Sequence, residues 1–262
     1  MNYIDIHCHL DSKEFDSDRG EILARMKEGG VGAITIGADF QSSKRAVEIA
    51  EANENVWACI GVHPEYSSVF PSPEHGEGGV GFLEELVKSP KVVGIGECGL
   101  DYFRINSDEN KKVQKLLFES QIQFAIKRDK PLMLHCREAY EDTLDILKTY
   151  KKEAGEKLRG NVHFFAGNTD VAREILDLGF TMSFTGVITF TRDYNEVIKY
   201  IPIESIMSET DAPFVSPAPY RGKRNEPIYV IEVVQKMAEI RGENMDILNK
   251  TIINNAKRVF GI

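Results

Sequence analysis

Five of the six histidines in this chain stand at the ends of short apolar, β-branched runs, at His7, His9, His63, His135 and His163. The sixth, His75, lies between Pro71 and Gly81, where turn-forming residues predict a surface loop. Imidazole nitrogens bind divalent metals and exchange protons near neutral pH. Scattered core histidines would not share one position in successive runs, so the pattern indicates a site assembled from strand ends.

Two of these histidines lie two residues apart. Side chains two apart on a strand leave the same face, so His7 and His9 can bind one cation together while Cys8 points the opposite way. Glu97 and Asp211 end two further runs. This set is too large for one tetrahedral zinc with an open position, but it suits two divalent ions that share a bridging carboxylate. The predicted metal ligands are His7, His9, Glu97, His135, His163 and Asp211.

Eight short apolar runs must position these side chains, and the stretches between them are long enough for crossover helices. This alternation predicts a (β/α)8 barrel, an α/β fold whose C-terminal strand ends meet at one mouth. A doubly wound open sheet is the alternative. We expect a single domain over residues 1–262 and a last helix over about Asn244–Phe260. The predicted strands are Tyr3–His9, Gly32–Gly37, Val56–His63, Val92–Glu97, Pro131–His135, Asn161–Phe165, Thr181–Gly186 and Ile206–Asp211.

The composition is that of a globular protein with an acidic balance. The 262 residues are 42% hydrophobic and 28% charged, which excludes collagen, a coiled coil and wholesale disorder. With 32 basic and 41 acidic residues the net charge is -9, so overall electrostatics cannot hold a polyanionic partner and any nucleic-acid contact must be local.

Nothing in the sequence predicts export or membrane insertion. Residues 1–10 contain neither a basic region nor an apolar stretch of signal-peptide length, and no run approaches the roughly 20 apolar residues of a membrane span. The four cysteines show no paired spacing, and Cys8, Cys98 and Cys136 are expected to be buried structural residues. We expect a cytoplasmic protein without membrane contact, and a monomer.

Eight motifs follow one another along the chain: YIDIHCHLD (3–11), IGVHPE (60–65), GIGECGLDY (94–102), PLMLHCR (131–137), VHFFAG (162–167), ETDAP (209–213), RGKRNEP (221–227) and NNAKRVFG (254–261). In these motifs the chain resembles the TatD family of metal-dependent deoxyribonucleases, within the amidohydrolase superfamily. Each motif alone is weak, but their number and order make the resemblance specific.

The resemblance implies a dinuclear centre in which His7, His9 and Asp211 hold one ion, His135 and His163 hold the other, and Glu97 bridges. Many relatives in the superfamily bridge with a carboxylated lysine. Here Lys91, the nearest lysine, lies at the other end of the strand, which points toward the nuclease branch. Imidazole and carboxylate ligands suit Zn, Mn, Ni or Co, while Mg prefers fewer imidazoles. The identity of the two ions is therefore left open among Zn, Mn, Mg, Ni and Co.

Several further residues are candidates for holding a phosphate. The resemblance assigns this role to His63, and a hydrogen bond to the neighbouring loop is the alternative. Arg137 offers a planar fork for phosphate oxygens, with a salt bridge at the barrel rim as the alternative. The last candidates are three cations close together in the chain, Arg221, Lys223 and Arg224. They could bind a phosphodiester backbone, and the alternative is that they belong to a solvated loop.

Aromatic and acidic neighbours complete the expected site. Tyr102, Phe103 and Tyr220 offer stacking faces for single-stranded bases, or else they pack at the barrel rim. Glu209 shares the face of Asp211, so we expect it either to orient a metal ligand or to make a core hydrogen bond.

The leading function is a metal-dependent deoxyribonuclease, expected to act as a 3'-5' exonuclease on single-stranded DNA ends. Glu97 and Asp211 are its catalytic candidates, and Asp211 is placed to accept a proton from the attacking water. One alternative is a hydrolase of a small ester, lactone, amide or phosphotriester, which would share the metals but not the phosphate contacts. A metal-binding scaffold without catalysis is a third hypothesis.

Overall fold

The computed structural model describes residues 1–69, 80–104 and 106–262, so His75 and most of the Pro71–Gly81 segment lie outside the described residues. Eight parallel strands form one sheet in the order of the sequence. They are β1 Tyr3–Cys8, β2 Val31–Ile36, β3 Val56–Ile60, β4 Val92–Asp101, β5 Leu132–Arg137, β6 Gly160–Val162, β7 Thr181–Phe184 and β8 Ile206–Ser208.

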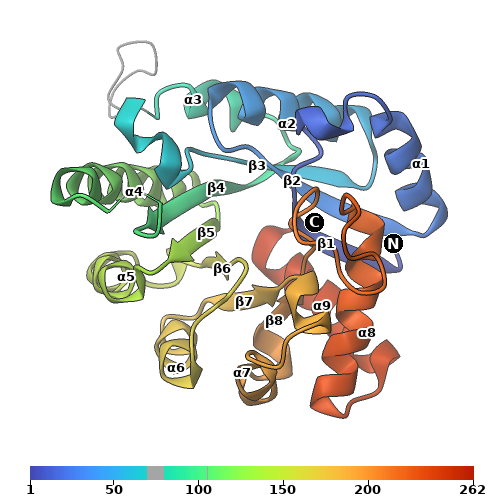
Figure 1. The fold of residues 1–262 in the computed structure, drawn as a ribbon. Coiled ribbons are helices and arrows are strands. Elements are labelled where there is room, and N and C mark those ends of the chain that lie inside the picture. The colour runs from blue at the N-terminus through green and yellow to red at the C-terminus, as the bar shows by residue number, and fades with distance from the viewer. Residues whose placement is uncertain (70–79, 105) are drawn as a thin grey trace.

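Helices follow the strands and surround them (Figure 1). The α-helices are α1 Arg19–Glu28, α2 Phe40–Ala52, α3 Leu83–Leu86, α4 Asp108–Arg128, α5 Tyr140–Ala154, α6 Thr169–Asp177, α7 Asn195–Tyr200, α8 Val230–Arg241 and α9 Met245–Phe260. Short 3-10 turns are η1 Lys13–Phe15, η2 Pro64–Val69, η5 Gly155–Lys157, η6 Gly186–Thr189, η7 Ile203–Ser205 and η8 Pro227–Tyr229.

The sheet closes where the segment after β8 meets the end of β1. The backbone N–H of Asp211 donates to the carbonyl of His7 at 2.8 Å, and that of His9 donates to the carbonyl of Ala212 at 2.7 Å. The predicted (β/α)8 barrel is therefore confirmed, and the open sheet is excluded.

Burial on both faces explains the uninterrupted apolar runs. All residues of β2 and β4 are buried, as expected when side chains alternate between the barrel interior and the helix layer. The predicted last helix is also confirmed: the Asn244 side chain accepts hydrogen bonds at the start of α9, and Gly261 takes a left-handed φ of 70° after its end.

Strand ends differ from the sequence prediction at the mouth of the barrel. Six of the eight strands stop before their predicted ends, by one residue in β1 and β2, by two in β7 and by three in β3, β6 and β8. In contrast, β4 continues beyond Glu97 through a bulge and stays paired with β5. Gly99 permits this pairing, because a Cβ at that position would lie 2.0 Å from the carbonyl oxygen of His135.

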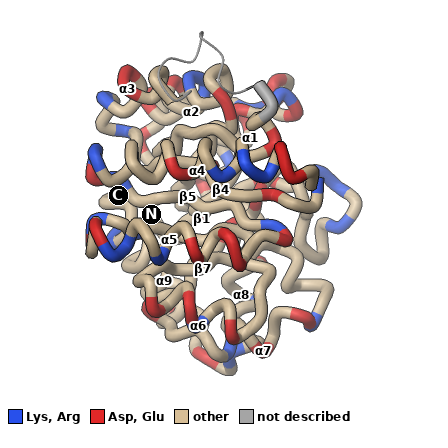
Figure 2. Tube along the Cα trace, turned by 90° about the vertical axis from the view of Figure 1, so that its left-hand side faces the viewer, with Lys and Arg blue, Asp and Glu red and all other residues tan. Residues whose placement is uncertain are grey.

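No helix in the described ranges combines the length and apolar character that crossing a membrane requires. Acidic and basic positions are intermixed in the view of Figure 2. Along the trace in that view, no large part of the chain carries charges of one sign only, which agrees with local rather than global attraction of a polyanion.

Candidate metal centre

The six predicted ligands converge at the C-terminal ends of the strands, although five different strands supply them. The rings of His7 and His163 stack with centroids 3.8 Å apart, and those of His7 and His9 meet edge to face at 5.1 Å. Residues more than 200 positions apart in the chain therefore share one small polar cluster.

Glu97 lies at the middle of this cluster and turns one carboxylate oxygen toward each half. Its Oε2 is 3.5 Å from Nε2 of His7 and 3.9 Å from Nε2 of His9. Its Oε1 is 2.8 Å from Nδ1 of His135 and 2.8 Å from Nε2 of His163. This is the geometry that a bridging carboxylate requires.

Asp211 closes the half that contains the first two histidines. Its Oδ1 is 3.3 Å from Nε2 of His9 and 3.6 Å from Nε2 of His7. Its backbone has a φ of 56°, in the left-handed region that aspartate tolerates better than most side chains. The chain turns sharply here and directs the carboxylate into the barrel.

The donors fit a pair of divalent ions. His7 is completely buried, yet neither ring nitrogen has a hydrogen-bond partner among the residues that the structure describes. An unpartnered buried nitrogen is costly unless another group binds it, and its Nε2 faces the two carboxylates. His7, His9 and Asp211 form one group that could hold an ion. The facing nitrogens of His135 and His163 are 3.2 Å apart and each is 2.8 Å from Glu97, so these two histidines could hold a second ion with Glu97 shared between them.

His63, which was left outside the predicted ligand set, also reaches the cluster. Its Nε2 is 3.5 Å from Oε1 of Glu97, and together with His135 these residues form a third group that could bind a metal. Its Nδ1 accepts a hydrogen bond from the backbone N–H of Glu65 at 3.1 Å, so in the neutral ring Nε2 carries the proton and directs it into the site. The hydrogen bond with the loop uses Nδ1 of His63, so Nε2 is still available to donate a hydrogen bond to a substrate.

The protonation states follow from burial and mutual attraction. Burial alone would raise the pKa of Glu97, but His163, His63 and the hydrogen bond with His135 lower it well below its usual range. Burial opposes protonation of His9, yet Asp211 raises the pKa of His9 to about 9. For His63, burial lowers the pKa to about 3, which keeps the ring neutral.

Two buried carboxylates absent from the predicted site hold its ligands in place. Oδ2 of Asp101 is 3.1 Å from Nε2 of His135, and its Oδ1 accepts the backbone N–H groups of Phe103 and Arg104. Such contacts orient a metal-binding imidazole. Asp101 lies four residues beyond Glu97, where the strand was predicted to end, and the bulge in β4 interrupts the alternation that could have identified it.

Asp5 is the second of these carboxylates. It is completely buried and accepts hydrogen bonds from the backbone of His7 and from Thr210, so it links β1 to the segment that carries Asp211. Its position two residues before His7 could have identified it as facing the same way.

Glu209 lies beside His163, as the sequence suggested. Its Oε1 is 3.5 Å from Nδ1 of His163 and accepts the backbone N–H of Phe164 at 2.7 Å. Its Oε2 accepts the hydroxyl of Ser183 at 2.6 Å. The carboxylate therefore has both a core hydrogen bond and a contact with the ligand ring.

The predicted phosphate-binding cations do not act as one cluster. Arg224 is held by both carboxylate oxygens of Asp18 and by the carbonyl of Glu14, away from the other two. Arg221 lies over the ring of Phe190 at 3.8 Å. Lys223 is exposed and has no ion pair with any residue that the structure describes. The guanidinium of Arg224 is therefore neutralised locally, and a role for the three cations in phosphate binding stays a prediction.

Arg137 makes a ring contact in place of the alternative salt bridge: its guanidinium lies 3.8 Å from the centroid of Phe103. Two of the three predicted stacking residues are already engaged. Tyr102 donates its hydroxyl to Asp142, and Tyr220 stacks on Tyr229 at 3.8 Å. Phe103 stays 54% exposed.

The cysteines next to the ligands are buried and unpaired. Cys8 contacts the carbonyl of Ile34, and Cys136 contacts the hydroxyl of Thr143 on α5. None of them belongs to a group of possible metal ligands among the described residues.

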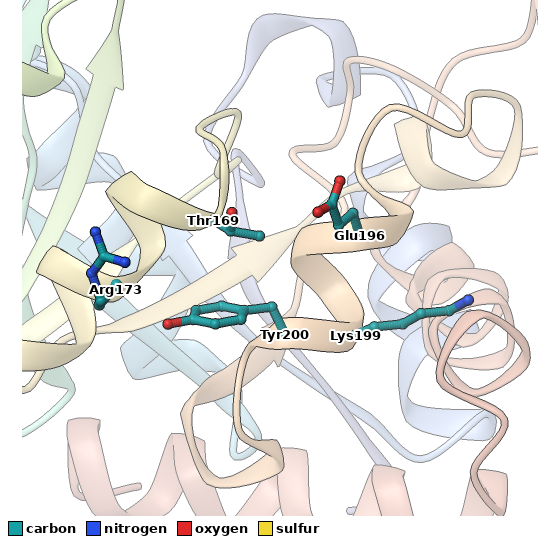
Figure 3. Close-up of a pocket in the computed structure, with 5 residues that line it drawn as sticks. All are labelled: Thr169, Arg173, Glu196, Lys199 and Tyr200. Atoms are coloured by element: carbon teal, nitrogen blue, oxygen red, sulfur yellow. The ribbon is translucent and has the colours of Figure 1, made fainter.

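A surface pocket lies elsewhere, between α6 and α7, where Thr169, Arg173, Glu196, Lys199 and Tyr200 surround it (Figure 3). Its side chains come from the outer helices, and none of them is a predicted ligand. It is separate from the metal cluster.

An eight-stranded parallel barrel with histidines and carboxylates gathered at its C-terminal mouth defines the class of metal-dependent barrel hydrolases. A family model described as TatD related DNase matches residues 4–261, and the chain belongs to this family. The predicted deoxyribonuclease family and hydrolase activity are thereby confirmed.

Individual relatives agree with this assignment. The chain is 38% identical over 261 residues to an uncharacterized metal-dependent hydrolase, YabD, of Bacillus subtilis, with 98% of each covered. It is 33% identical to the 3'-5' ssDNA/RNA exonuclease TatD of Pantoea ananatis, covering 98% of this chain and 99% of the relative. The crystal structure of the TatD homologue YjjV from Escherichia coli superposes with a TM-score of 0.89 at 27% identity, covering 100% of this chain and 98% of that chain.

Proposed function

We propose that this protein is a 3'-5' exonuclease that hydrolyses phosphodiester bonds at the ends of single-stranded DNA with two bound divalent ions. The observation that carries the proposal is Glu97, whose two oxygens face two separate sets of imidazoles. The polarity and the single-stranded substrate are supported by relatives named as 3'-5' ssDNA/RNA exonucleases.

The protein's own residues have distinct roles in this proposal. When bound, the ions would polarise the phosphoryl oxygen and make a water molecule more acidic. Zn, Mn, Mg, Ni and Co remain the candidates. His7, His9 and Asp211 would hold one ion, His135 and His163 would hold the other, and Glu97 would contribute to both. Asp211 also accepts the proton that the attacking water releases, because its carboxylate is ionised and lies at the mouth.

Substrate positioning falls to groups around the cluster. Nε2 of His63 donates to a phosphate oxygen, a role that its hydrogen bond from the Glu65 backbone favours by fixing the proton on that nitrogen. Arg137, Arg221 and Lys223 are exposed cations that reach the flanking phosphates. Arg224 acts indirectly, by holding its loop against Asp18.

Further properties are proposed on less direct grounds. Four buried, unpaired cysteines support a reducing compartment, and we propose a cytoplasmic location. The one eight-stranded sheet supports a single domain over residues 1–262. We keep the prediction of a monomer, which light scattering tests.

Metal-depleted protein, assayed on end-labelled single-stranded DNA with Mg, Mn, Zn, Ni, Co or no addition, tests the proposal. We expect no cleavage without metal and stepwise shortening from the 3' end with at least one ion. Internal cuts or shortening from the 5' end would contradict the polarity. Turnover of lactones or phosphotriesters without any cleavage of DNA would instead support the small-substrate hydrolase.

A further inference from the structure

Exposed aromatic side chains concentrate around the mouth of the barrel. Six aromatic residues are more than one third exposed among the described residues, and five of them follow the C-terminal end of a strand. They are Phe40 after β2, Tyr66 after β3, Phe103 after β4, Phe190 after β7 and Phe214 after β8, while the sixth, Tyr200, lies on α7. Exposed aromatic rings are unfavourable in water, and a random distribution would spread them over the whole surface. Their concentration at the mouth therefore indicates a function for them there.

The two most exposed rings flank the metal cluster. Phe103 is 54% exposed and Phe214 is 50% exposed. In a barrel whose eight strands follow sequence order, β4 and β8 are half a circumference apart, so the loops that carry these rings lie on opposite sides of the mouth.

Each ring is attached to a different half of the cluster. Phe214 meets the ring of His9 edge to face at 5.9 Å, and its N–H donates to the carbonyl of Asp211. The N–H of Phe103 donates to Asp101, the carboxylate that contacts His135. The two exposed rings are therefore positioned by the same residues that would position the ions.

A phosphodiester carries one nucleoside on each side of the phosphorus atom. Resting on the proposed exonuclease function, we propose that Phe103 and Phe214 stack on the two bases that flank the scissile phosphate. Arg137, which covers one face of Phe103, leaves the other face for the base and keeps N–H donors for a phosphate.

This arrangement accounts for how an acidic protein can hold a nucleic acid. The net charge of -9 opposes long-range attraction, whereas base stacking needs no net charge and tolerates any sequence. Stacking on a protein ring also requires an unpaired base, so these two residues would make the enzyme prefer single strands over a duplex.

The test combines enzyme variants with abasic substrates. Kinetics are measured on a single-stranded trinucleotide and on two analogues that lack one base, on either side of the bond that is cut. We expect Phe103→Ala and Phe214→Ala each to raise KM for the intact substrate roughly tenfold with kcat nearly unchanged, while Phe214→Trp restores KM. Tyr200→Ala, which removes a ring that is 44% exposed on α7, is the control and should match the wild type.

The decisive result is that the effects on KM of removing the ring and of removing its base do not add. Removing the base that stacks on Phe214 should raise KM for the wild type but add nothing to Phe214→Ala, and the other abasic analogue should pair in the same way with Phe103→Ala. Additive effects, or unchanged KM in variants that bind metal normally, would overturn the stacking proposal while leaving the exonuclease function intact. Failure of the wild type to cleave any single strand with any metal would overturn both.

Discussion

The ligand cluster and the loop after β8 organise charged residues in opposite ways. The cluster joins His7 to Asp211, more than 200 residues apart, around one carboxylate. The loop holds Arg221, Lys223 and Arg224 within four residues. Even so, Arg221 lies over the ring of Phe190, Arg224 pairs with Asp18, and Lys223 is exposed without an ion pair to any described residue. Strand topology, rather than nearness in sequence, therefore decides which side chains act together.

The largest effect is expected from the centre of the cluster. Glu97→Gln should abolish turnover and reduce metal content, because the amide cannot supply the shared negative charge, while the barrel stays folded. Elemental analysis, circular dichroism and nuclease assays measure these three properties. Glu156→Gln, at a side chain that is 98% exposed, is the control. A variant with full metal content and activity would exclude the bridge.

A smaller effect is expected at the edge of the cluster. Asp101→Asn should weaken metal binding or activity by roughly 10- to 100-fold, since His135 loses the carboxylate that fixes its ring. Titration of metal into depleted protein should show one weakened ion and one unchanged ion, because Asp101 contacts only the half that contains His135. Equal loss of both ions would mean that the two halves are not independent.

Two cations of the loop after β8 should have separable effects, Lys223 on DNA binding and Arg224 on the stability of the protein. Lys223→Ala should raise KM for DNA and reduce the salt dependence of binding by roughly 0.7 for one lost phosphate contact to a single strand. Arg224→Ala should instead lower the Tm with little change in that slope, because Arg224 is neutralised by Asp18. In the double variant, the change in KM should follow Lys223 and the change in Tm should follow Arg224. The reverse assignment would restore Arg224 as a phosphate contact.

The sequence predicted the cluster well because the local pattern of each run shows which side chains share a face, and the barrel topology brings the ends of all the strands together. His7 and His9 had to share a face, and every parallel strand had to end at the same mouth. The extension of β4 to Asp101 was not predicted, because it depends on a bulge and on the close approach of Gly99 to β5. Neither feature has a periodic signal.

Loop side chains were predicted less well for a physical reason. Arg224 and Asp18 are far apart in sequence and belong to different loops, so their ion pair depends on tertiary packing that composition does not encode. Tyr220 likewise packs its ring on Tyr229, which is the aromatic packing contact given as the alternative to base stacking. The exposed ring of Phe214 was missed altogether, since one phenylalanine in a loop has no distinguishing pattern.

The smallest effects are expected at the cysteines next to the ligands, where each comparison is between neighbouring residues of one strand. Cys8 lies between His7 and His9 but contacts a carbonyl of β2, and Cys136 follows His135 but contacts α5. Serine at either position keeps a hydroxyl that can make the same hydrogen bond, and so does serine in place of Cys98, which lies near the carbonyl of Met133. Each change should cost about 1 kcal/mol of unfolding free energy and leave metal content and activity unchanged. Denaturant unfolding and elemental analysis measure the two quantities separately. Loss of metal from any one of these variants would show that its side chain faces the barrel interior, and the alternation that places the histidines there would then be wrong for that strand.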